Sequence, residues 1–131
     1  MSGVYEIVFD GGSKGNPGLG YGSYEISQKG EVLAHNLEQY GNNVTNNQAE
    51  YRTLVHALAW LADHAGEELS STTIEVYGDS QLVIKQLKGE WKIKDAILRR
   101  IAMDARAQMD RFADVRLNWH PRAMSVKRLG H

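Results

Sequence analysis

The chain has 131 residues, enough for a domain with its own hydrophobic core, and we expect a single domain over residues 1–131. The absence of cysteine excludes disulfides, a thiol nucleophile and a cysteine-based zinc site, and it is typical of the reducing cytoplasm, where we expect the protein to act. No apolar run approaches the ~20 residues of a membrane span, and residues 1–10 contain no Lys or Arg, so we expect neither a membrane segment nor a signal peptide.

The formal net charge is only −1, but the charges are unevenly distributed along the chain. Residues 1–80 contain three basic and eleven acidic side chains, whereas residues 81–131 contain twelve Lys or Arg against five Asp or Glu, a local balance of +7. Such asymmetry indicates either a polyanionic partner for the basic half or a set of solvated helix faces. The charge pattern alone does not separate these two interpretations.

Three strands are predicted in the first third of the chain. Residues 4–10, 21–27 and 32–40 contain the β-branched and aromatic side chains typical of strands. Residues 11–22 are rich in glycine and contain one proline, so we predict a loop with turns there. A turn at residues 28–30 joins the second strand to the third, and the three strands are predicted to form an antiparallel meander.

Helices and strands alternate in the predictions for the rest of the chain. A helix begins at Thr45, where Gln48 stands at capping-box spacing, and apolar residues follow helical spacing as far as residue 62. The further predicted elements are a strand at residues 73–77, a helix from residues 79–80 to about residue 87, a helical stretch over residues 93–112 and a strand at residues 115–119, with breaks at Gly89 and Pro121.

The order of these elements predicts an α/β protein with a mixed five-stranded sheet flanked by helices. Three strands form the antiparallel meander, and the later strands join it in parallel through helical crossovers. Trp60 and Trp119 lie within a predicted helix and a predicted strand, and we expect both side chains in the core.

Three acidic residues stand at the predicted ends of regular elements. Asp10 ends the first strand, Glu50 lies in the first turns of the first helix, and Asp79 directly follows the fourth strand. Ligands gather at the C-terminal ends of strands in α/β sheets, and carboxylates that converge there repel one another unless a cation neutralises them. A hard divalent ion with oxygen ligands, above all Mg²⁺, would meet this need.

Each acid taken singly also has a purely structural explanation. Asp10 could open a turn, Asp79 could cap a helix, and Glu50 could favour the positive end of the helix dipole. Spacing alone does not bring three carboxylates together in space, so both interpretations stay open at this point.

Three motifs surround these acids. Residues 9–20 read F-D-G-G-S-K-G-N-P-G-L-G, residues 45–51 read T-N-N-Q-A-E-Y, and residues 76–84 read V-Y-G-D-S-Q-L-V-I. In sequence, order and spacing they resemble the motifs of the ribonuclease H family, type 1, and the resemblance covers nearly the whole chain. It implies a ribonuclease H-like fold and an endonuclease that hydrolyses the RNA strand of RNA–DNA hybrids.

The resemblance also implies a mechanism and a set of metal ligands. Asp10 would bridge two Mg²⁺ ions, with Mn²⁺ as a substitute, and Glu50 and Asp79 would help to hold the ion on the leaving-group side. Two ions about 4 Å apart stabilise both the attacking and the departing oxygen of an in-line displacement by water. The products would carry 5′-phosphate and 3′-hydroxyl ends, and we expect a monomer whose partner is the hybrid substrate.

Further residues match family positions that contact the substrate. Glycine permits close approach of the backbone to RNA 2′-hydroxyls, and side-chain amides offer contacts to hydroxyls and base edges. Trp91 lies among lysines and would pack against DNA sugars, although a place in the core is the alternative; for Asn46 and Asn47 the alternative is polar decoration of a helix start. The predicted substrate-binding residues are Gly11, Gly12, Asn16, Thr45, Asn46, Asn47, Gln48 and Trp91.

The C-terminal segment departs from the family pattern. Most type 1 members carry a fourth acid in a pattern like P-R-E-x-N-x-x-A-D, whereas residues 120–131 read H-P-R-A-M-S-V-K-R-L-G-H and no Asp or Glu follows Asp114. With a loop two residues longer, His131 takes the place of the fourth acid, and we expect it to be a catalytic metal ligand that suits Mn²⁺ better than Mg²⁺. A passive chain end is the alternative. The family's closing helix is expected to be missing, and His120 is a separate candidate for the family's loop histidine.

Two other functions remain open. A resolvase or exonuclease of the same superfamily would share the carboxylate core, although the first two motifs favour a ribonuclease H. A hybrid-binding module that lacks catalysis is suggested by the missing fourth acid.

Overall fold

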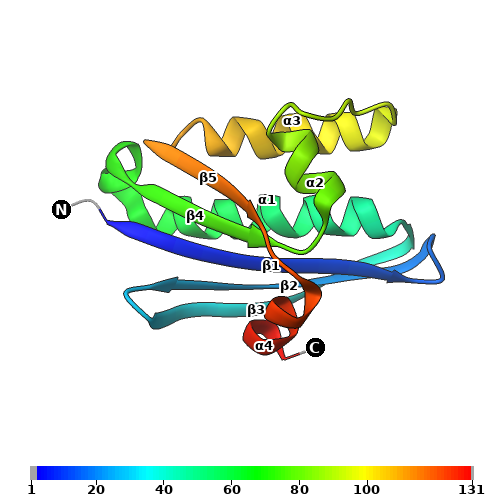
Figure 1. Cartoon of the computed structure of the whole chain (residues 1–131), viewed down its shortest axis with the longest axis horizontal. Coiled ribbons are helices and arrows are strands. Elements are labelled where there is room, and N and C mark those ends of the chain that lie inside the picture. Colours follow the sequence, from blue (N-terminus) through cyan, green and yellow to red (C-terminus); the bar gives the residue numbers. More distant parts are fainter. Residues whose placement is uncertain (1–2, 131) are drawn as a thin grey trace.

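The computed structural model describes residues 3–130, and these residues form one five-stranded sheet with the strand order β3-β2-β1-β4-β5 (Figure 1). The first three strands pair antiparallel, whereas β4 pairs parallel with both β1 and β5. The mixed α/β sheet predicted from the sequence is therefore confirmed. The strands are β1 (Val4–Lys14), β2 (Gly18–Gln28), β3 (Glu31–Val44), β4 (Thr73–Gly78) and β5 (Asp114–Trp119).

Helices cover the two faces of the sheet unequally (Figure 1). Ile7 and Phe9 of β1 belong to the main hydrophobic core beneath α1, whereas Val8 points to the opposite face, where it lines a hollow with Met124 of α4. The core thus lies between one face of the sheet and the helices α1, α2 and α3, and α4 covers part of the other face. The helices are α1 (Asn46–Ala65), α2 (Gln81–Leu87), α3 (Ala96–Met109) and α4 (Arg122–Leu129), with a 3-10 turn η1 (Gly66–Ser71) after α1.

The glycine-rich stretch forms strands, and the loop predicted for residues 11–22 is wrong. β1 continues to Lys14 and β2 begins at Gly18, so that only residues 15–17 turn. The reason is the close approach of α1: a Cβ on Gly11 would lie 2.6 Å from the carbonyl carbon of Ala49. The glycines here allow a helix to pack directly on a strand backbone, which a loop prediction from composition does not consider.

Helix α1 begins as the sequence predicts. Thr45 is its N-cap, the Thr45 hydroxyl accepts a hydrogen bond from the Gln48 amide at 3.1 Å, and Gln48 Oε1 accepts one from the Thr45 amide at 3.2 Å. This reciprocal capping box fixes the helix start, and with it the position of Glu50 five residues further along.

The structure differs from the sequence prediction at two places in the second half of the chain. The helical stretch predicted over residues 93–112 is shorter, because Asp95 caps α3 and residues 88–94 form an irregular connection. Residues 122–129 form the short helix α4, although the closing helix was expected to be missing. Buried Ser125 and Leu129 seat this helix on the sheet, and Arg128 forms a 2.7 Å ion pair with the buried carboxylate of Glu25.

Trp119 is a third correction, since its side chain is 45% exposed rather than part of the core. It stands at the C-terminal end of the edge strand β5, where no helix covers it fully, whereas Trp60 packs partly buried against the core cluster. Among the described residues, no helix combines the length and the apolar character needed to cross a membrane.

Candidate metal centre and nucleic-acid interface

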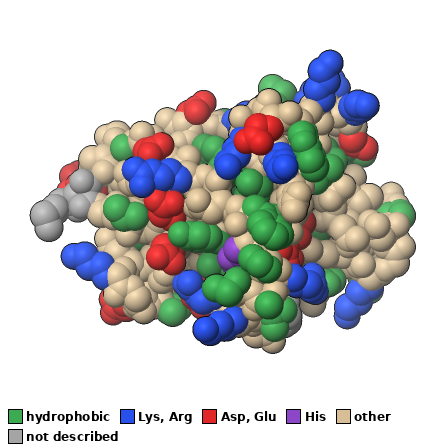
Figure 2. All heavy atoms as spheres, viewed as in Figure 1, with side chains coloured by type: hydrophobic (Ala, Val, Ile, Leu, Met, Phe, Trp, Pro, Cys, Tyr) green, Lys and Arg blue, Asp and Glu red, His purple; other side chains and the backbone are tan. Residues whose placement is uncertain are grey.

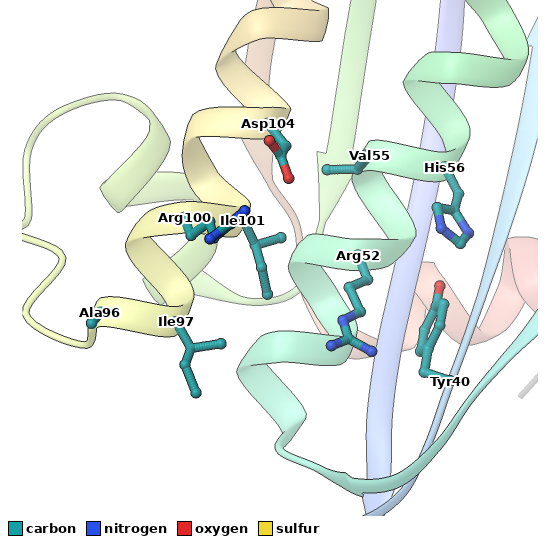
Figure 3. Close-up of a pocket in the computed structure, with 9 residues that line it drawn as sticks. All are labelled: Tyr40, Arg52, Val55, His56, Ala96, Ile97, Arg100, Ile101 and Asp104. Atoms are coloured by element: carbon teal, nitrogen blue, oxygen red, sulfur yellow. The ribbon is translucent and has the colours of Figure 1, made fainter.

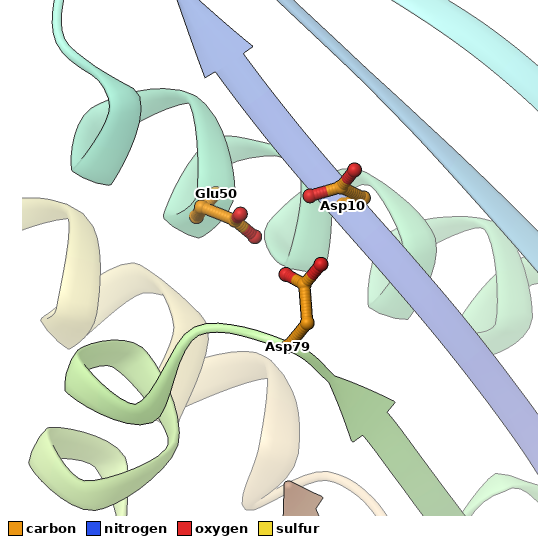
Figure 4. Close-up of side chains that lie close together, drawn as sticks. All are labelled: Asp10, Glu50 and Asp79. Carbon is orange, nitrogen blue, oxygen red and sulfur yellow. The ribbon is translucent and has the colours of Figure 1, made fainter. Parts of the chain in front are cut away.

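The structure brings the three predicted carboxyl groups together. Asp10 comes from the middle of β1, Glu50 from the first turns of α1, and Asp79 from the bend between β4 and α2 (Figure 4). One oxygen of each carboxyl group lies within 4.8 Å of those of the other two. Because β1 and β4 are adjacent and parallel, the C-terminal part of both strands presents its acid to the same place.

The cluster is largely withdrawn from solvent. Asp10 is 3% exposed and Glu50 6% exposed, and the side chain of Asp79 is 8% exposed. Burial, followed by the nearby charge of Asp10, raises the pKa of Glu50 well above its ordinary value of 4.5. Burial and the charge of Asp10 also raise the pKa of Asp79 from 3.8, while Arg122 opposes this shift. In the absence of a cation the cluster therefore favours a partly protonated state.

These residues fit a divalent cation. Glu50 Oε2 and Asp79 Oδ2 are buried and accept no hydrogen bond from the residues that the structure describes. Unpaired buried acceptors and adjacent carboxylates each carry a free-energy cost, and a hard cation with oxygen ligands would remove both. The simpler explanation for Asp79 also fails, because Ser80 and not Asp79 caps α2 through its hydroxyl.

The fourth ligand position has no carboxylate among the described residues of α4. The charged group that α4 does bring to the cluster is Arg122, whose Nη1 lies 3.8 Å from Asp79 Oδ2. His131, the predicted fourth ligand, lies outside the described residues, so its role stays a prediction. His120 is engaged elsewhere: its Nε2 lies 2.7 Å from the Ser125 hydroxyl, and its ring stacks on Tyr77.

The predicted substrate-binding residues gather where the β1–β2 hairpin meets the start of α1. The Asn46 amide donates to Asn16 Oδ1 at 2.9 Å, and Asn46 Oδ1 accepts from the Ser13 amide at 2.8 Å. Both asparagines therefore bind the hairpin to the helix start as well as facing solvent. Thr45 and Gln48 are occupied with capping, and Gln48 is buried. Asn47 is half-buried beside them.

Two predicted glycines also have a packing reason. A Cβ on Gly11 would meet the backbone of α1, and one on Gly12 would lie 2.6 Å from the Tyr21 hydroxyl. The same close packing keeps the Gly11 amide beside the cluster, where it donates to Asp10 Oδ1 at 2.9 Å. The position of these glycines next to the carboxylates is thus a consequence of how β1, β2 and α1 pack.

Trp91 is exposed, so the alternative that its side chain lies in the core is wrong. Its side chain is 44% exposed in the connection between α2 and α3, and Lys85 Nζ lies 4.9 Å from the ring centroid. Figure 2 shows Lys and Arg side chains at the end of the molecule where this connection lies. An exposed aromatic ring thus lies among the basic residues that the sequence concentrates after residue 80.

Sequence reasoning missed two residues near these sites. Trp119 Nε1 donates to the Asp79 carbonyl oxygen at 3.0 Å, so the end of β5 supports the bend that carries Asp79. Gln86 is 5% exposed and bonds both to α1 and to the irregular connection over residues 88–95, which we call the Trp91 connection. A polar residue on the apolar face of a short predicted helix was the available signal for Gln86, whereas an indole bond across strands leaves no trace in the sequence.

A wide groove lies elsewhere. It measures about 780 Å³ and runs between α1 and α3, where Val55 of α1 points towards Asp104 of α3, while His56 points towards Tyr40 of β3 (Figure 3). None of the three clustered carboxylates lines it. The candidate site is therefore the carboxylate cluster and not this groove.

A mixed sheet with a buried carboxylate cluster beside its adjacent parallel strands β1 and β4 defines a class of protein, the α/β proteins whose clustered carboxylates could hold a divalent cation. A family model described as reverse transcriptase-like matches residues 9–126. The crystal structure of RNase H1 from the halophilic archaeon Halobacterium salinarum has a TM-score of 0.84 and 39% identity, over 94% of this chain and 89% of that one. The chain belongs to the ribonuclease H family, type 1.

Further relatives agree with this assignment. The sequence of ribonuclease HI from Halobacterium salinarum is 42% identical over 126 residues, 95% of this chain. This chain spans 60% of the length of that protein, and 32% of a bifunctional protein of Mycobacterium tuberculosis that is 40% identical over 122 residues. A crystal structure of LC11-RNase H1 in complex with an RNA/DNA hybrid has a TM-score of 0.86 and 28% identity, over 94% of this chain and 89% of that one.

Proposed function

We propose that the protein is an endonuclease that hydrolyses the RNA strand of RNA–DNA hybrids. The observation that carries this proposal is the convergence of Asp10, Glu50 and Asp79 on one buried cluster in a chain of the ribonuclease H family. The hybrid bound to LC11-RNase H1 supports the substrate class. The products would carry 5′-phosphate and 3′-hydroxyl ends.

The carboxylates would hold two divalent ions. Asp10 of β1, Glu50 of α1 and Asp79 after β4 would supply the ligands. The ions supply the positive charge that neutralises both the attacking and the departing oxygen of the phosphate. The protein's own part is to position: Gly11 donates to Asp10, Trp119 supports the Asp79 backbone, and the capping box fixes Glu50.

We propose Mg²⁺ as the natural ion and Mn²⁺ as a substitute. The donor set among the described residues is made of carboxylate oxygens, which both ions accept. If His131 supplies the fourth ligand, its imidazole nitrogen will favour Mn²⁺. Titrating the parent and His131→Ala with each ion on one hybrid tests this: His131→Ala should lose activity most at limiting metal, and identical titrations would make His131 a passive chain end.

The substrate would lie across the hairpin, the start of α1 and the Trp91 connection. The hairpin backbone would approach the RNA 2′-hydroxyls, Asn16, Asn46 and Asn47 would contact hydroxyls and base edges, and Thr45 would contact a DNA phosphate. Trp91 and the lysines around it would contact the DNA sugars and phosphates. That the protein is monomeric and cytoplasmic stays a prediction.

A cleavage assay on three matched duplexes tests the function. We expect the protein to cut only the RNA strand of an RNA–DNA hybrid when Mg²⁺ is present, to leave duplex DNA and duplex RNA intact, and to be inactive in EDTA. End analysis of the fragments should give 5′-phosphates. Comparable cutting of duplex DNA would instead indicate a resolvase or exonuclease of the same superfamily.

A second function, hybrid binding without catalysis, is favoured by one observation: the described part of α4 brings Arg122 rather than a carboxylate to the cluster. The same assay decides it. Tight hybrid binding together with no cleavage in either Mg²⁺ or Mn²⁺ would establish the binding module.

A further inference from the structure

Buried polar side chains join helix α1 to the Trp91 connection. The Tyr51 hydroxyl, on α1 next to Glu50, donates to Gln86 Oε1 at 2.8 Å. Gln86 Nε2 in turn donates to the carbonyl oxygen of Lys92 at 3.1 Å. Tyr51 is fully buried and Gln86 is 5% exposed, so the bond between them is shielded from water, while the bond to Lys92 is partly buried.

The donor and the acceptor are fixed in each of these two hydrogen bonds. A carbonyl oxygen accepts only, so the amide nitrogen of Gln86 must face Lys92 and its oxygen must face Tyr51. Burial raises the pKa of Tyr51 to about 12, which keeps its hydroxyl protonated and able to donate. The backbone of Gln86 is held as well, because Arg106 of α3 donates to its carbonyl oxygen at 2.8 Å.

The Trp91 connection has few other attachments to the core. The amides of Glu90 and Trp91 donate to the Lys85 carbonyl at the end of α2, and Arg99 donates to the Ile93 carbonyl. Apart from half-buried Ile93, the side chains of residues 88–95 are exposed. The bond from Gln86 is the point at which a buried side chain of α2 holds the middle of the connection.

We propose that Gln86 is a positioning residue for hybrid binding, which fixes the Trp91 connection so that the Trp91 ring and its flanking lysines meet the DNA strand. The inference rests on the proposed function. An ordered connection binds without first losing conformational freedom, whereas one released from Gln86 would lose it on binding and weaken affinity. Chemistry at the carboxylate cluster does not involve this bond, so the turnover of bound substrate should not change.

The test is a double-mutant cycle on hybrid affinity. Gln86→Met, Trp91→Ala and the double variant are titrated into a fluorescently labelled hybrid in EDTA, where no strand is cut, and kcat and KM are measured separately with Mg²⁺. Gln86→Met should raise Kd and KM about fivefold, the size of one lost buried hydrogen bond, with kcat unchanged. The double variant should lose less affinity than the sum of the two single losses, because both changes weaken the contact that Trp91 makes.

The matched control is Thr53→Val. It removes the hydrogen bonds that the Thr53 hydroxyl forms with the Ala49 carbonyl and with the Tyr40 hydroxyl, neither of which involves the Trp91 connection, and should lower stability without raising Kd. If Gln86→Met does not fold, Gln86→Glu takes its place, since it keeps the acceptor for Tyr51 and loses the donor to Lys92.

Each outcome decides the proposal. Fully additive losses of affinity, an unchanged Kd in Gln86→Met, or a fall in kcat alone would each overturn the role of Gln86 and leave the proposed function standing. A parent protein that neither binds nor cuts hybrids would overturn the proposed function itself, before any Gln86 variant is compared.

Discussion

At the scale of single residues, the central physical problem is negative charge in a buried place. Glu50 sits 6% exposed among two other carboxylates, and one of its oxygens has no hydrogen bond from the described residues. A folded protein tolerates such a group by protonation or by a cation. The cluster should therefore lower the stability of the folded protein when no metal is bound, and it should support cleavage when metal is bound. Single substitutions separate these two effects.

The first prediction concerns Asp10. Changing Asp10 to Asn keeps the shape of the side chain but removes a charge that would help to hold the ions, so cleavage should fall by at least about 10³-fold while the hybrid Kd in EDTA stays within about twofold. Single-turnover cleavage and fluorescence anisotropy measure the two quantities. Near-normal turnover of Asp10→Asn would rule out the proposed mechanism.

The second prediction concerns Glu50 and pH. Because folding raises the pKa of Glu50 above 4.5, the folded chain binds this proton more tightly than the unfolded chain does. Its contribution to stability is then most favourable below pH 4.5 and is lost as the pH rises towards the folded pKa. In EDTA, Glu50→Gln should melt close to the parent at pH 4 and about 3–6 °C above it at pH 8.

Metal addition provides the control for this prediction. Saturating Mn²⁺ should raise the melting temperature of the parent at pH 8 and close most of its gap to Glu50→Gln, because a bound ion stabilises the folded state that holds the ligands. Parallel melting curves across the pH range would show that Glu50 carries no buried charge.

How far the sequence predicted these residues depends on the interaction involved. The capping box at Thr45 and Gln48 is local, and its spacing was readable. The convergence of Asp10, Glu50 and Asp79 depends on the packing of β1, α1 and β4, so the residues alone left it open and only the family motifs pointed to it. Trp119 illustrates the remainder, since its exposure follows from the position of β5 at the sheet edge.

At the scale of elements, the site depends on how closely α1 packs against β1. Composition indicates only that residues 11–22 are flexible, whereas the structure uses their glycines for contact between a helix and a strand backbone. Flexibility and close packing have the same sequence signature, which is why the predicted loop is wrong. The same limit applies to α4, whose eight residues are too short for a periodic apolar pattern to be distinctive.

The third prediction tests this contact. A methyl group on Gly11 would lie 2.6 Å from the Ala49 carbonyl carbon and 2.7 Å from the Glu50 nitrogen, and neither backbone atom can move without shifting α1. Gly11→Ala should lower the free energy of unfolding by about 1–3 kcal/mol and should also reduce cleavage, because Glu50 moves relative to Asp10. Urea denaturation and single-turnover cleavage measure these effects.

The matched control is Ile26→Val in the core of β2. It should cost about 1 kcal/mol by removing one buried methyl group, yet leave single-turnover cleavage near that of the parent well below the melting temperature. If Gly11→Ala and Ile26→Val are equally active at equal stability, the close contact at Gly11 does not set the geometry of the site.

At the scale of the whole molecule, opposite charges serve different purposes in different places. Acidic side chains dominate the first 80 residues, and three of them form the buried cluster, while the basic excess after residue 80 includes the exposed lysines of the Trp91 connection. Phosphates of a bound hybrid would lie near these lysines, and its scissile bond near the cluster. A net charge of −1 therefore conceals a surface suited to a polyanion.

The last prediction follows from this distribution. Lysines that neutralise phosphates release counterions, so the logarithm of hybrid affinity should fall linearly with the logarithm of salt concentration. Replacing Lys92 and Lys94 by Gln should reduce the steepness of that line by about 0.7–0.9 for each phosphate contact removed, when Kd is measured by anisotropy across a NaCl series in EDTA. Lys127→Gln, on α4 at the opposite face of the sheet, is the control and should leave the slope unchanged. A flat response in the parent, or equal slopes in all variants, would show that the basic half of the chain lies outside the interface. Its basic residues would then be explained as solvated helix faces.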